Sequence, residues 1–136
     1  MILMKESKAK ELKLNPIARI VAQSSYSQDP TLFTTAPVGA VKNLLKKANW
    51  KIEDVDLFEI NEAFAVVPMA AMKDLNIPEE KVNIFGGGCA LGHPLGASGA
   101  RIVVTLINTM KKRNAHRGIA TLCVGGGEGV ALALEM

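Results

Sequence analysis

A histidine inside a glycine-rich segment is the residue of this 136-residue chain whose surroundings best suit chemistry. The segment 86–101 holds six glycines, and His93 lies within it between Gly92 and Pro94. Glycine loses much backbone entropy on folding but allows positive φ and the close approach of a ligand, so the segment favours a loop. Imidazole accepts and releases a proton near neutral pH. A lone histidine is more often structural, but this setting favours a catalytic base.

Polar side chains also follow two apolar runs of the chain. Asn61 comes directly after the run 57–60, and Cys123 lies near the end of the run 118–124, just before consecutive glycines. Ligands of open α/β sheets bind beyond the carboxyl ends of the strands. Either residue could be purely structural, Asn61 in a turn and Cys123 as a small core side chain. A thiol whose pKa is lowered by its neighbours can instead act as an acid or a base.

The elements that must position these residues alternate between strand and helix patterns. The chain order β-α-β-α-β-α-β-β indicates an α/β fold, with a mainly parallel sheet covered by helices and an antiparallel last pair of strands. After a helical segment at 3–13, the expected strands are 17–23, 57–60, 81–85, 118–124 and 130–135, and the expected helices are 38–48, 64–75 and 99–113. Residues 24–37 read as a polar loop.

Two of the expected helices raise a question about where they begin. An interior proline removes a hydrogen bond, so Pro68 is awkward within the pattern 64–75. Either the regular helix begins near Pro68, or it begins earlier and is distorted; we favour the second. Ser98 is expected to be the N-cap of the helix that begins at Gly99.

Composition excludes several functional classes. The net charge of +3 is too small for a dedicated nucleic-acid-binding protein. No apolar run approaches membrane-spanning length, and the opening run 1–4 is too short for a signal peptide. The two cysteines give no disulfide framework and fit a reducing compartment, so we expect a cytoplasmic protein. With 49% apolar but only 4% aromatic residues, the core should be aliphatic.

Three segments together resemble the signature sequences of the thiolase family, the acetyl-CoA acetyltransferases and 3-ketoacyl-CoA thiolases. They read NEAFA at 61–65, GHPLGASGAR at 92–101 and CVGGGEG at 123–129. The second and third are highly specific as a pair, whereas NEAFA alone is only suggestive. The resemblance extends over 16–136 and matches the second of the two repeated domains of a thiolase. It implies half of a thiolase fold, with 1–15 as a remnant of the linker helix.

The resemblance assigns roles to the candidate residues. His93 matches the histidine that deprotonates the nucleophilic, acyl-accepting cysteine. Cys123 matches the second cysteine of the family, which abstracts and returns the α-proton of the acetyl group. Asn61 matches the asparagine that, with the histidine and partly through water, polarises a thioester oxygen in one oxyanion hole. The backbone N–H of Gly125 matches a donor of the second oxyanion hole.

Other residues near these segments are expected to bind substrate or to support the site. Ala63 and Phe64 are the expected substrate-binding positions; Phe64 would line the pantetheine side of the pocket, although a plain core position is equally consistent with the sequence. Cys89 lies four residues from His93 but matches an ordinary apolar position of the family, so we assign it to packing. Glu62 resembles a residue of the family that supports the site without touching the substrate.

The implied reaction is the condensation of two acetyl-CoA molecules to acetoacetyl-CoA, or the reverse thiolysis. Coenzyme A thioesters would be the substrates, with no metal and no further cofactor. The family's acylated cysteine and most of its CoA-binding loop belong to a preceding N-terminal domain that nothing here resembles. We therefore expect an excised domain, a proteolytic fragment or a truncated gene product, inactive alone and part of a homodimer or homotetramer when full length.

Two alternatives belong to other functional classes or families. A thiolase-like binding or scaffold domain could keep the fold without the chemistry, but the joint presence of Asn61, His93 and Cys123 argues against it. A ketoacyl synthase of related fold is the other alternative, and the glycine-rich segment after Cys123 argues for a thiolase.

Overall fold

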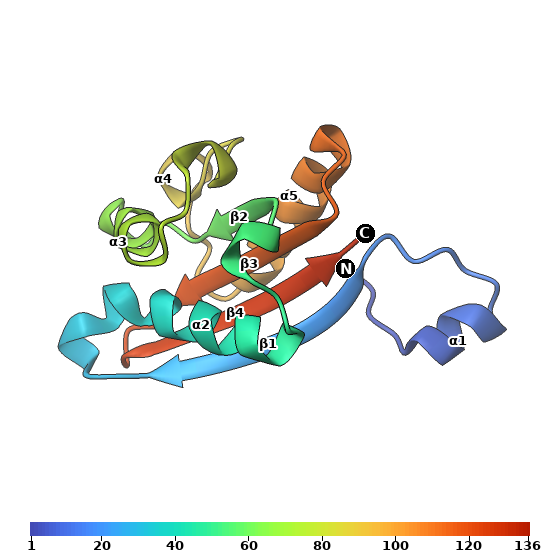
Figure 1. Ribbon diagram of the computed structural model, residues 1–136, viewed down its shortest axis with the longest axis horizontal. Helices are drawn as coiled ribbons and strands as arrows, with labels where there is room; N and C mark the ends of the chain where they lie inside the picture. The colour runs from blue at the N-terminus through green and yellow to red at the C-terminus, as the bar shows by residue number, and fades with distance from the viewer.

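Four strands form one mixed sheet, in the order β1-β4-β3-β2, in the computed structural model, which describes residues 1–136 (Figure 1). The strands are β1 (Arg19–Ser27), β2 (Leu57–Ile60), β3 (Arg117–Cys123) and β4 (Glu128–Glu135). β2 and β3 are parallel, whereas β4 is antiparallel to both β3 and β1. The expected α/β class and the antiparallel pair at the end of the chain are confirmed. The expectation of a mainly parallel sheet was wrong, because β1 pairs with the antiparallel β4 and leaves β2–β3 as the one parallel pair.

Helices lie on both faces of this sheet. In Figure 1, α2 lies across one face of the sheet and α5 behind it, while α1 lies apart, beyond the beginning of β1. The α-helices are α1 (Glu6–Glu11), α2 (Ala36–Ala48), α3 (Val66–Leu75), α4 (Gly88–Leu91) and α5 (Ser98–Arg113), and the 3₁₀ helices are η1 (Pro30–Thr35), η2 (Ile52–Asp54) and η3 (Glu79–Lys81). None of the helices is long and apolar enough to cross a lipid bilayer.

The two faces of the sheet bury separate, largely aliphatic cores. One core joins the sheet to α2 and α3, and the other joins it to α5. Each fully buried aliphatic side chain of such a core contributes about 1.5–3 kcal/mol to stability. The α5 core consists of Leu57, Ile102, Val103, Leu106, Met110, Ala120 and Leu134. The expectation of an aliphatic core is confirmed.

The side chains of β2 alternate between these two cores, so only every second side chain of the strand faces α5. Phe58 and Ile60 pack in the core on the α2–α3 side, and Leu57 packs in the α5 core. Because successive side chains of a strand point to opposite faces, Glu59 and Asn61 lie on the same face as Leu57. Two polar side chains at the end of a fully buried strand therefore face α5.

The strand expected at 81–85 does not form. Only one bridge, between Phe58 and Val82, joins this segment to the sheet. Asn83 has a left-handed backbone with φ of 46°, which interrupts an extended run. Its side-chain amide instead accepts from the Ile60 N–H and donates to the Ile60 carbonyl, both at 2.8 Å. One side chain thus replaces the backbone partner that a fifth strand would have offered to β2.

Our preferred beginning of the helix expected at 64–75 was wrong. α3 begins at Val66, and residues 61–65 form no regular element. Pro68 is then the third helical residue, where the missing N–H costs nothing because the first N–H groups of a helix lack intrahelical acceptors. The alternative, a regular helix that begins near Pro68, is confirmed.

The expected cap of α5 was also wrong. Ser98 is the first helical residue and Ala97 is the cap position, with no side-chain capping bond. The Ser98 hydroxyl instead contacts His93 and Pro94. Earlier in the chain, β1 extends to Ser27, and η1 occupies part of the segment 24–37 that we expected to be a loop.

Close packing of α2 on β4 leads to a prediction about Gly129. An alanine Cβ at this position would lie 2.5 Å from the carbonyl oxygen of Ala36, a backbone atom at the start of α2. We expect Gly129→Ala to lower the free energy of unfolding by about 1–3 kcal/mol, as overpacking does elsewhere. Urea unfolding followed by circular dichroism measures this change.

The matched control is Gly96→Ala, because a Cβ at Gly96 would meet no atom within 4 Å. Its unfolding midpoint should stay close to that of the unmodified chain. Equal midpoints for the Gly129 and Gly96 variants would contradict the described packing.

Candidate active site

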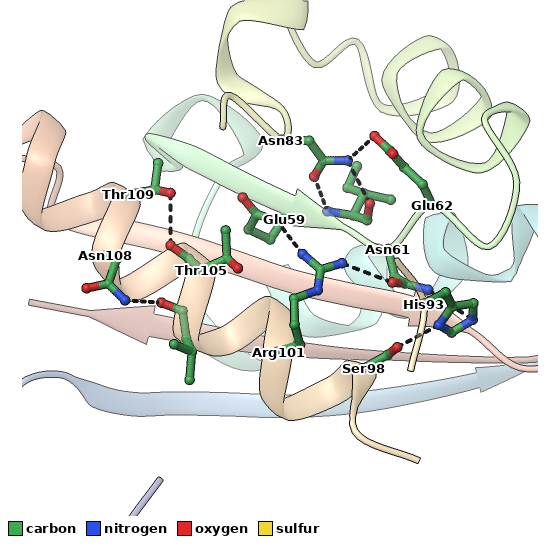
Figure 2. Close-up of polar contacts among 12 residues, drawn as sticks. Glu59, Asn61, Glu62, Asn83, His93, Ser98, Arg101, Thr105, Asn108 and Thr109 are labelled. Atoms are coloured by element: carbon green, nitrogen blue, oxygen red, sulfur yellow. Dashed lines mark hydrogen bonds and ion pairs between the residues drawn. The ribbon is translucent and has the colours of Figure 1, made fainter. Parts of the chain in front are cut away.

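Asn61 and His93, two of the sequence-predicted site residues, come together at the carboxyl end of β2 (Figure 2). The side-chain nitrogen of Asn61 lies 3.4 Å from Nε2 of His93. The Asn61 N–H donates to the Thr121 carbonyl at 2.9 Å, which continues the β2–β3 ladder one residue past the strand. Asn61 is fully buried and His93 is half-buried, so the pair combines a rigid amide with an imidazole that solvent or a ligand can reach.

The other ring nitrogen of His93 is held by the beginning of α5. Nδ1 lies 2.6 Å from the Ser98 hydroxyl, and this hydroxyl donates to the Pro94 carbonyl at 3.2 Å. Ser98 itself is buried, with 2% of its surface exposed. The turn 94–98 therefore holds the imidazole ring from behind and leaves its Nε2 edge toward Asn61.

Glu62 anchors the glycine-rich loop that carries His93. Its carboxylate accepts from the Cys89 N–H and from the Asn83 side chain, each at 2.9 Å. A Cβ at Gly87 would lie 2.3 Å from the Glu62 carboxyl carbon, so the glycine allows the loop to approach this closely. Partial burial raises the pKa of Glu62, but the hydrogen bonds from Cys89 and Asn83 outweigh it and hold this pKa below its usual value.

A buried ion pair that the sequence analysis missed lies behind Asn61. The Arg101 guanidinium, from the first turn of α5, donates to the Asn61 side-chain oxygen at 3.3 Å (Figure 2). Its Nη1 lies 3.7 Å from a carboxylate oxygen of Glu59, which is 1% exposed. Neither Glu59 oxygen forms a hydrogen bond within the chain. A glutamate inside the apolar run 57–60 was the signal that could have revealed this pair.

Burial of Glu59 raises the pKa of its carboxyl group to about 7. The Arg101 charge opposes this change, and the neighbouring Glu62 adds to it. Desolvation dominates because the carboxylate has lost water without gaining hydrogen-bond donors.

Cys123 ends β3, but the structure does not bring its thiol into contact with Asn61 or His93. The side chain is buried in the core on the α2–α3 side, opposite the face on which Asn61 lies. Burial raises the pKa of the Cys123 thiol. Asn61 and Cys123 are nonetheless neighbours along the sheet edge, because β2 and β3 are parallel and end side by side.

The turn after Cys123 offers an unused backbone donor. Gly125 is exposed, its N–H forms no hydrogen bond within the chain, and a Cβ there would meet no atom within 4 Å. The turn is closed by other groups: the Val124 N–H donates to Glu128 at 2.8 Å, and the Gly127 N–H donates to Val124 at 3.0 Å. The Gly125 N–H is thus free to bind an oxygen atom of a ligand.

The remaining predicted residues differ in where they lie. Phe64 is 59% exposed and packs edge-on against Phe33, so the core alternative for Phe64 was wrong. Ala63 is partly buried against the α2–α3 core. Cys89 is exposed, so its assignment to packing was wrong, because the short α4 turns this side chain outward. A hydrogen bond to Glu62 raises the pKa of the Cys89 thiol.

Comparisons with known proteins agree on one family. The model of the thiolase C-terminal domain matches residues 14–136. Acetyl-CoA acetyltransferase of Thiocystis violacea is 54% identical over 134 residues, which cover 98% of this chain and 34% of that protein. The cytosolic acetyl-CoA acetyltransferase of Mus musculus is 52% identical over 134 residues, which again cover 98% of this chain and 34% of that protein. The chain therefore spans about a third of the length of these relatives.

A solved structure shows the same fold. The crystal structure of the Bacillus anthracis acetyl-CoA acetyltransferase superimposes with a TM-score of 0.94 at 52% sequence identity. The match covers 97% of this chain and 34% of that chain.

The burial of Glu59 predicts a specific dependence of stability on pH. Because its pKa is raised from the ordinary 4.5 to about 7, Glu59 stabilises the fold below about pH 4.5, and this contribution is lost as the pH rises through about 7. Relative to Glu59→Gln, the unmodified chain should lose up to about 3 kcal/mol of unfolding free energy over that interval. Urea unfolding of both proteins between these pH values measures the difference.

Glu80→Gln, which removes an exposed carboxylate, is the control and should follow the unmodified chain at every pH. If Glu59→Gln also stays parallel to the unmodified chain, Glu59 is not held in the low-dielectric environment described here.

Proposed function

The chain belongs to the thiolase family, as a C-terminal domain, and we propose that it supplies the base and the oxyanion-stabilising groups for acyl transfer between coenzyme A thioesters. Its relatives are acetyl-CoA acetyltransferases, which are acyltransferases. The observation that carries the proposal is the contact between Asn61 and His93, in which an immobile amide donor and an accessible imidazole face the same space.

In this proposal His93 removes the proton of a nucleophilic thiol supplied by the remainder of the enzyme. The resulting thiolate attacks the acyl carbon of the thioester, and the coenzyme A thiolate leaves and takes the proton back from the imidazolium. Covalent catalysis of this kind divides one difficult step into two easier ones. A positioned base of this type contributes typically a factor of about 10²–10⁴.

Asn61, with His93, would stabilise the negative charge that develops on a thioester oxygen. The Asn61 amide is suited to this because it is buried and held on both sides, so it need not reorganise when charge appears. The free N–H of Gly125 would serve as a donor for the second oxyanion. Each aimed donor of this kind is worth roughly 3–4 kcal/mol.

Cys123 would exchange a proton with the α-carbon of the acetyl group. Its raised pKa keeps the thiol protonated near neutral pH, which suits a group that returns a proton to an enolate during cleavage of acetoacetyl-CoA. In the condensation direction the same sulfur must first be deprotonated, so this direction depends on a neighbouring base or charge.

Acetyl-CoA and acetoacetyl-CoA are the proposed substrates, with no metal and no further cofactor. The exposed ring of Phe64 offers an apolar face near the end of β2 for the pantetheine arm, with Ala63 beside it. A cytoplasmic location and a homo-oligomeric complete enzyme are part of the same proposal.

A chimeric enzyme tests the proposed residues. In the Bacillus anthracis acetyl-CoA acetyltransferase, the matching C-terminal third is replaced by this chain, which is 52% identical to it. We expect the chimera to cleave acetoacetyl-CoA in the presence of coenzyme A. His93→Ala should lower kcat by about 10²–10⁴, and Asn61→Ala by about 10²–10³.

His116→Ala is the matched control, because His116 is an exposed histidine at the beginning of β3. An active chimera in which His93→Ala turns over as fast as His116→Ala would refute the role of His93. That outcome would favour a binding domain without chemistry of its own.

The isolated chain should show no thiolase turnover. Its own thiols are poor candidates for the nucleophile, because the pKa of each is raised and the ring nitrogens of His93 bond to Asn61 and Ser98 and to neither thiol. The assay follows loss of acetoacetyl-CoA with the pure chain and coenzyme A. Turnover by the chain that disappears in a Cys89→Ala/Cys123→Ala variant would overturn this prediction.

A further inference from the structure

The Arg101 guanidinium determines which way the Asn61 amide faces. Arginine carries only hydrogen-bond donors. Its Nη2 lies 3.3 Å from one end of the Asn61 side chain, so that end must be the carbonyl oxygen. The opposite end, which lies 3.4 Å from Nε2 of His93, is then the NH₂ group. The amide orientation thus follows from the chemistry of its neighbour.

The same reasoning extends to the proton of His93. Since the Asn61 NH₂ group is a donor, the facing Nε2 must be the acceptor and carries no proton in the neutral ring. The proton then resides on Nδ1, which donates to the Ser98 hydroxyl at 2.6 Å. The hydroxyl in turn donates to the Pro94 carbonyl at 3.2 Å. The contacts from Asn61 through His93 and Ser98 to Pro94 thus pair each donor with an acceptor.

Glu59 holds the guanidinium in place. Its carboxylate lies 3.7 Å from Nη1 of Arg101, and the side chains of the two residues are 2% and 18% exposed. An arginine on the first turn of a helix would otherwise extend into solvent, where water satisfies its five N–H groups. The buried carboxylate draws the guanidinium inward, to a place from which Nη2 reaches Asn61 (Figure 2).

We propose that Arg101, anchored by Glu59, is a positioning residue that sets the tautomer of His93 through Asn61. The catalytic consequence rests on the proposed function: with the proton on Nδ1, Nε2 keeps a lone pair, and this lone pair can exchange the Asn61 N–H for the proton of the nucleophilic thiol. A base with the wrong tautomer presents an N–H in place of a lone pair. In a serine protease, such a change lowers kcat on the order of 10⁴-fold.

Nitrogen-15 NMR of histidine-labelled chain tests the proposal without any assay of activity. Spectra are recorded at a pH where titration shows both rings to be neutral, and His116→Gln assigns the two sets of signals. The unmodified chain should give a protonated Nδ1 and an unprotonated Nε2 for His93. A proton on Nε2 would overturn the proposal at once.

The double variant Glu59→Leu/Arg101→Met removes the control of the tautomer. Replacing both members of a buried ion pair by apolar residues of similar size avoids leaving one charge unpaired, and such exchanges often preserve the fold. We expect the Nδ1–H preference to be lost, with both ring signals of His93 moving toward each other. Arg113→Met, an exposed arginine on the same helix, should leave the spectrum unchanged. An unchanged His93 tautomer in the folded double variant would refute the proposal.

A second variant covers the case in which the double variant does not fold. Asn61→Leu removes the amide that links Arg101 to His93 but keeps the Glu59–Arg101 pair. The Nδ1–H preference of His93 should be lost in the same way. If the variant keeps the Nδ1–H form, the tautomer is set by Ser98 alone and the proposal fails.

The chimeric enzyme links the tautomer to catalysis. There the double variant should lower kcat at least tenfold with little change in KM, because the substrate contacts remain. If the chimera itself has no activity, the proposed function fails while the NMR result still decides the tautomer. If the tautomer shifts and kcat does not, the positioning role in catalysis is refuted.

Discussion

A carboxylate buried in a strand is the constraint on which the arrangement of this site depends. The side-chain alternation of β2 directs Glu59 into the interface with α5, where it is 1% exposed. A buried charge needs a partner, and α5 supplies Arg101 from its first turn. The same alternation places Asn61 two residues later on the same face, within reach of that arginine. One structural requirement thus brings the base and the amide donor into a common network.

Close approach of backbone segments makes this network possible. The loop before α5 reaches the end of β2 because Gly87 and Gly88 leave room for Glu62, whose carboxylate in turn accepts from the loop. The Asn83 side chain completes the edge of β2 where no fifth strand lies. The site is therefore held together by side chains that hydrogen-bond to backbone groups, and small changes in the loop should alter the position of His93.

The periodic parts of this chain were predictable from its sequence, and the parts fixed by tertiary contacts were not. β2 and α5 were predicted within a few residues because their apolar spacing reflects burial on one or two faces. The segment 81–85 has a strand composition, yet the left-handed backbone of Asn83 ends it, and only the contact with Ile60 explains that conformation. Ser98 has the chemistry of a cap, but a histidine competes for its hydroxyl.

Residue type and motif were sufficient to predict the candidate residues, but not the Glu59–Arg101 pair that holds Asn61. Charged residues are mostly exposed, so the sequence alone predicts neither the burial of Glu59 nor a role for Arg101 beyond the motif that it ends. Pairing between them is a property of the folded chain alone. The side on which Cys123 lies likewise follows from the alternation along β3, which is visible once Ile119 is seen in the same core.

In the proposed function, Asn61 and His93 act together on one thioester oxygen. The most direct measurement is a crystal structure of the chimeric enzyme with acetoacetyl-CoA bound. We predict that a thioester oxygen accepts from the Asn61 NH₂ group within about 2.7–3.1 Å, directly or through one water molecule, and that Nε2 of His93, which can donate only after it has taken a proton, lies beside the same oxygen. A thioester oxygen bound away from both residues would rule out their joint action.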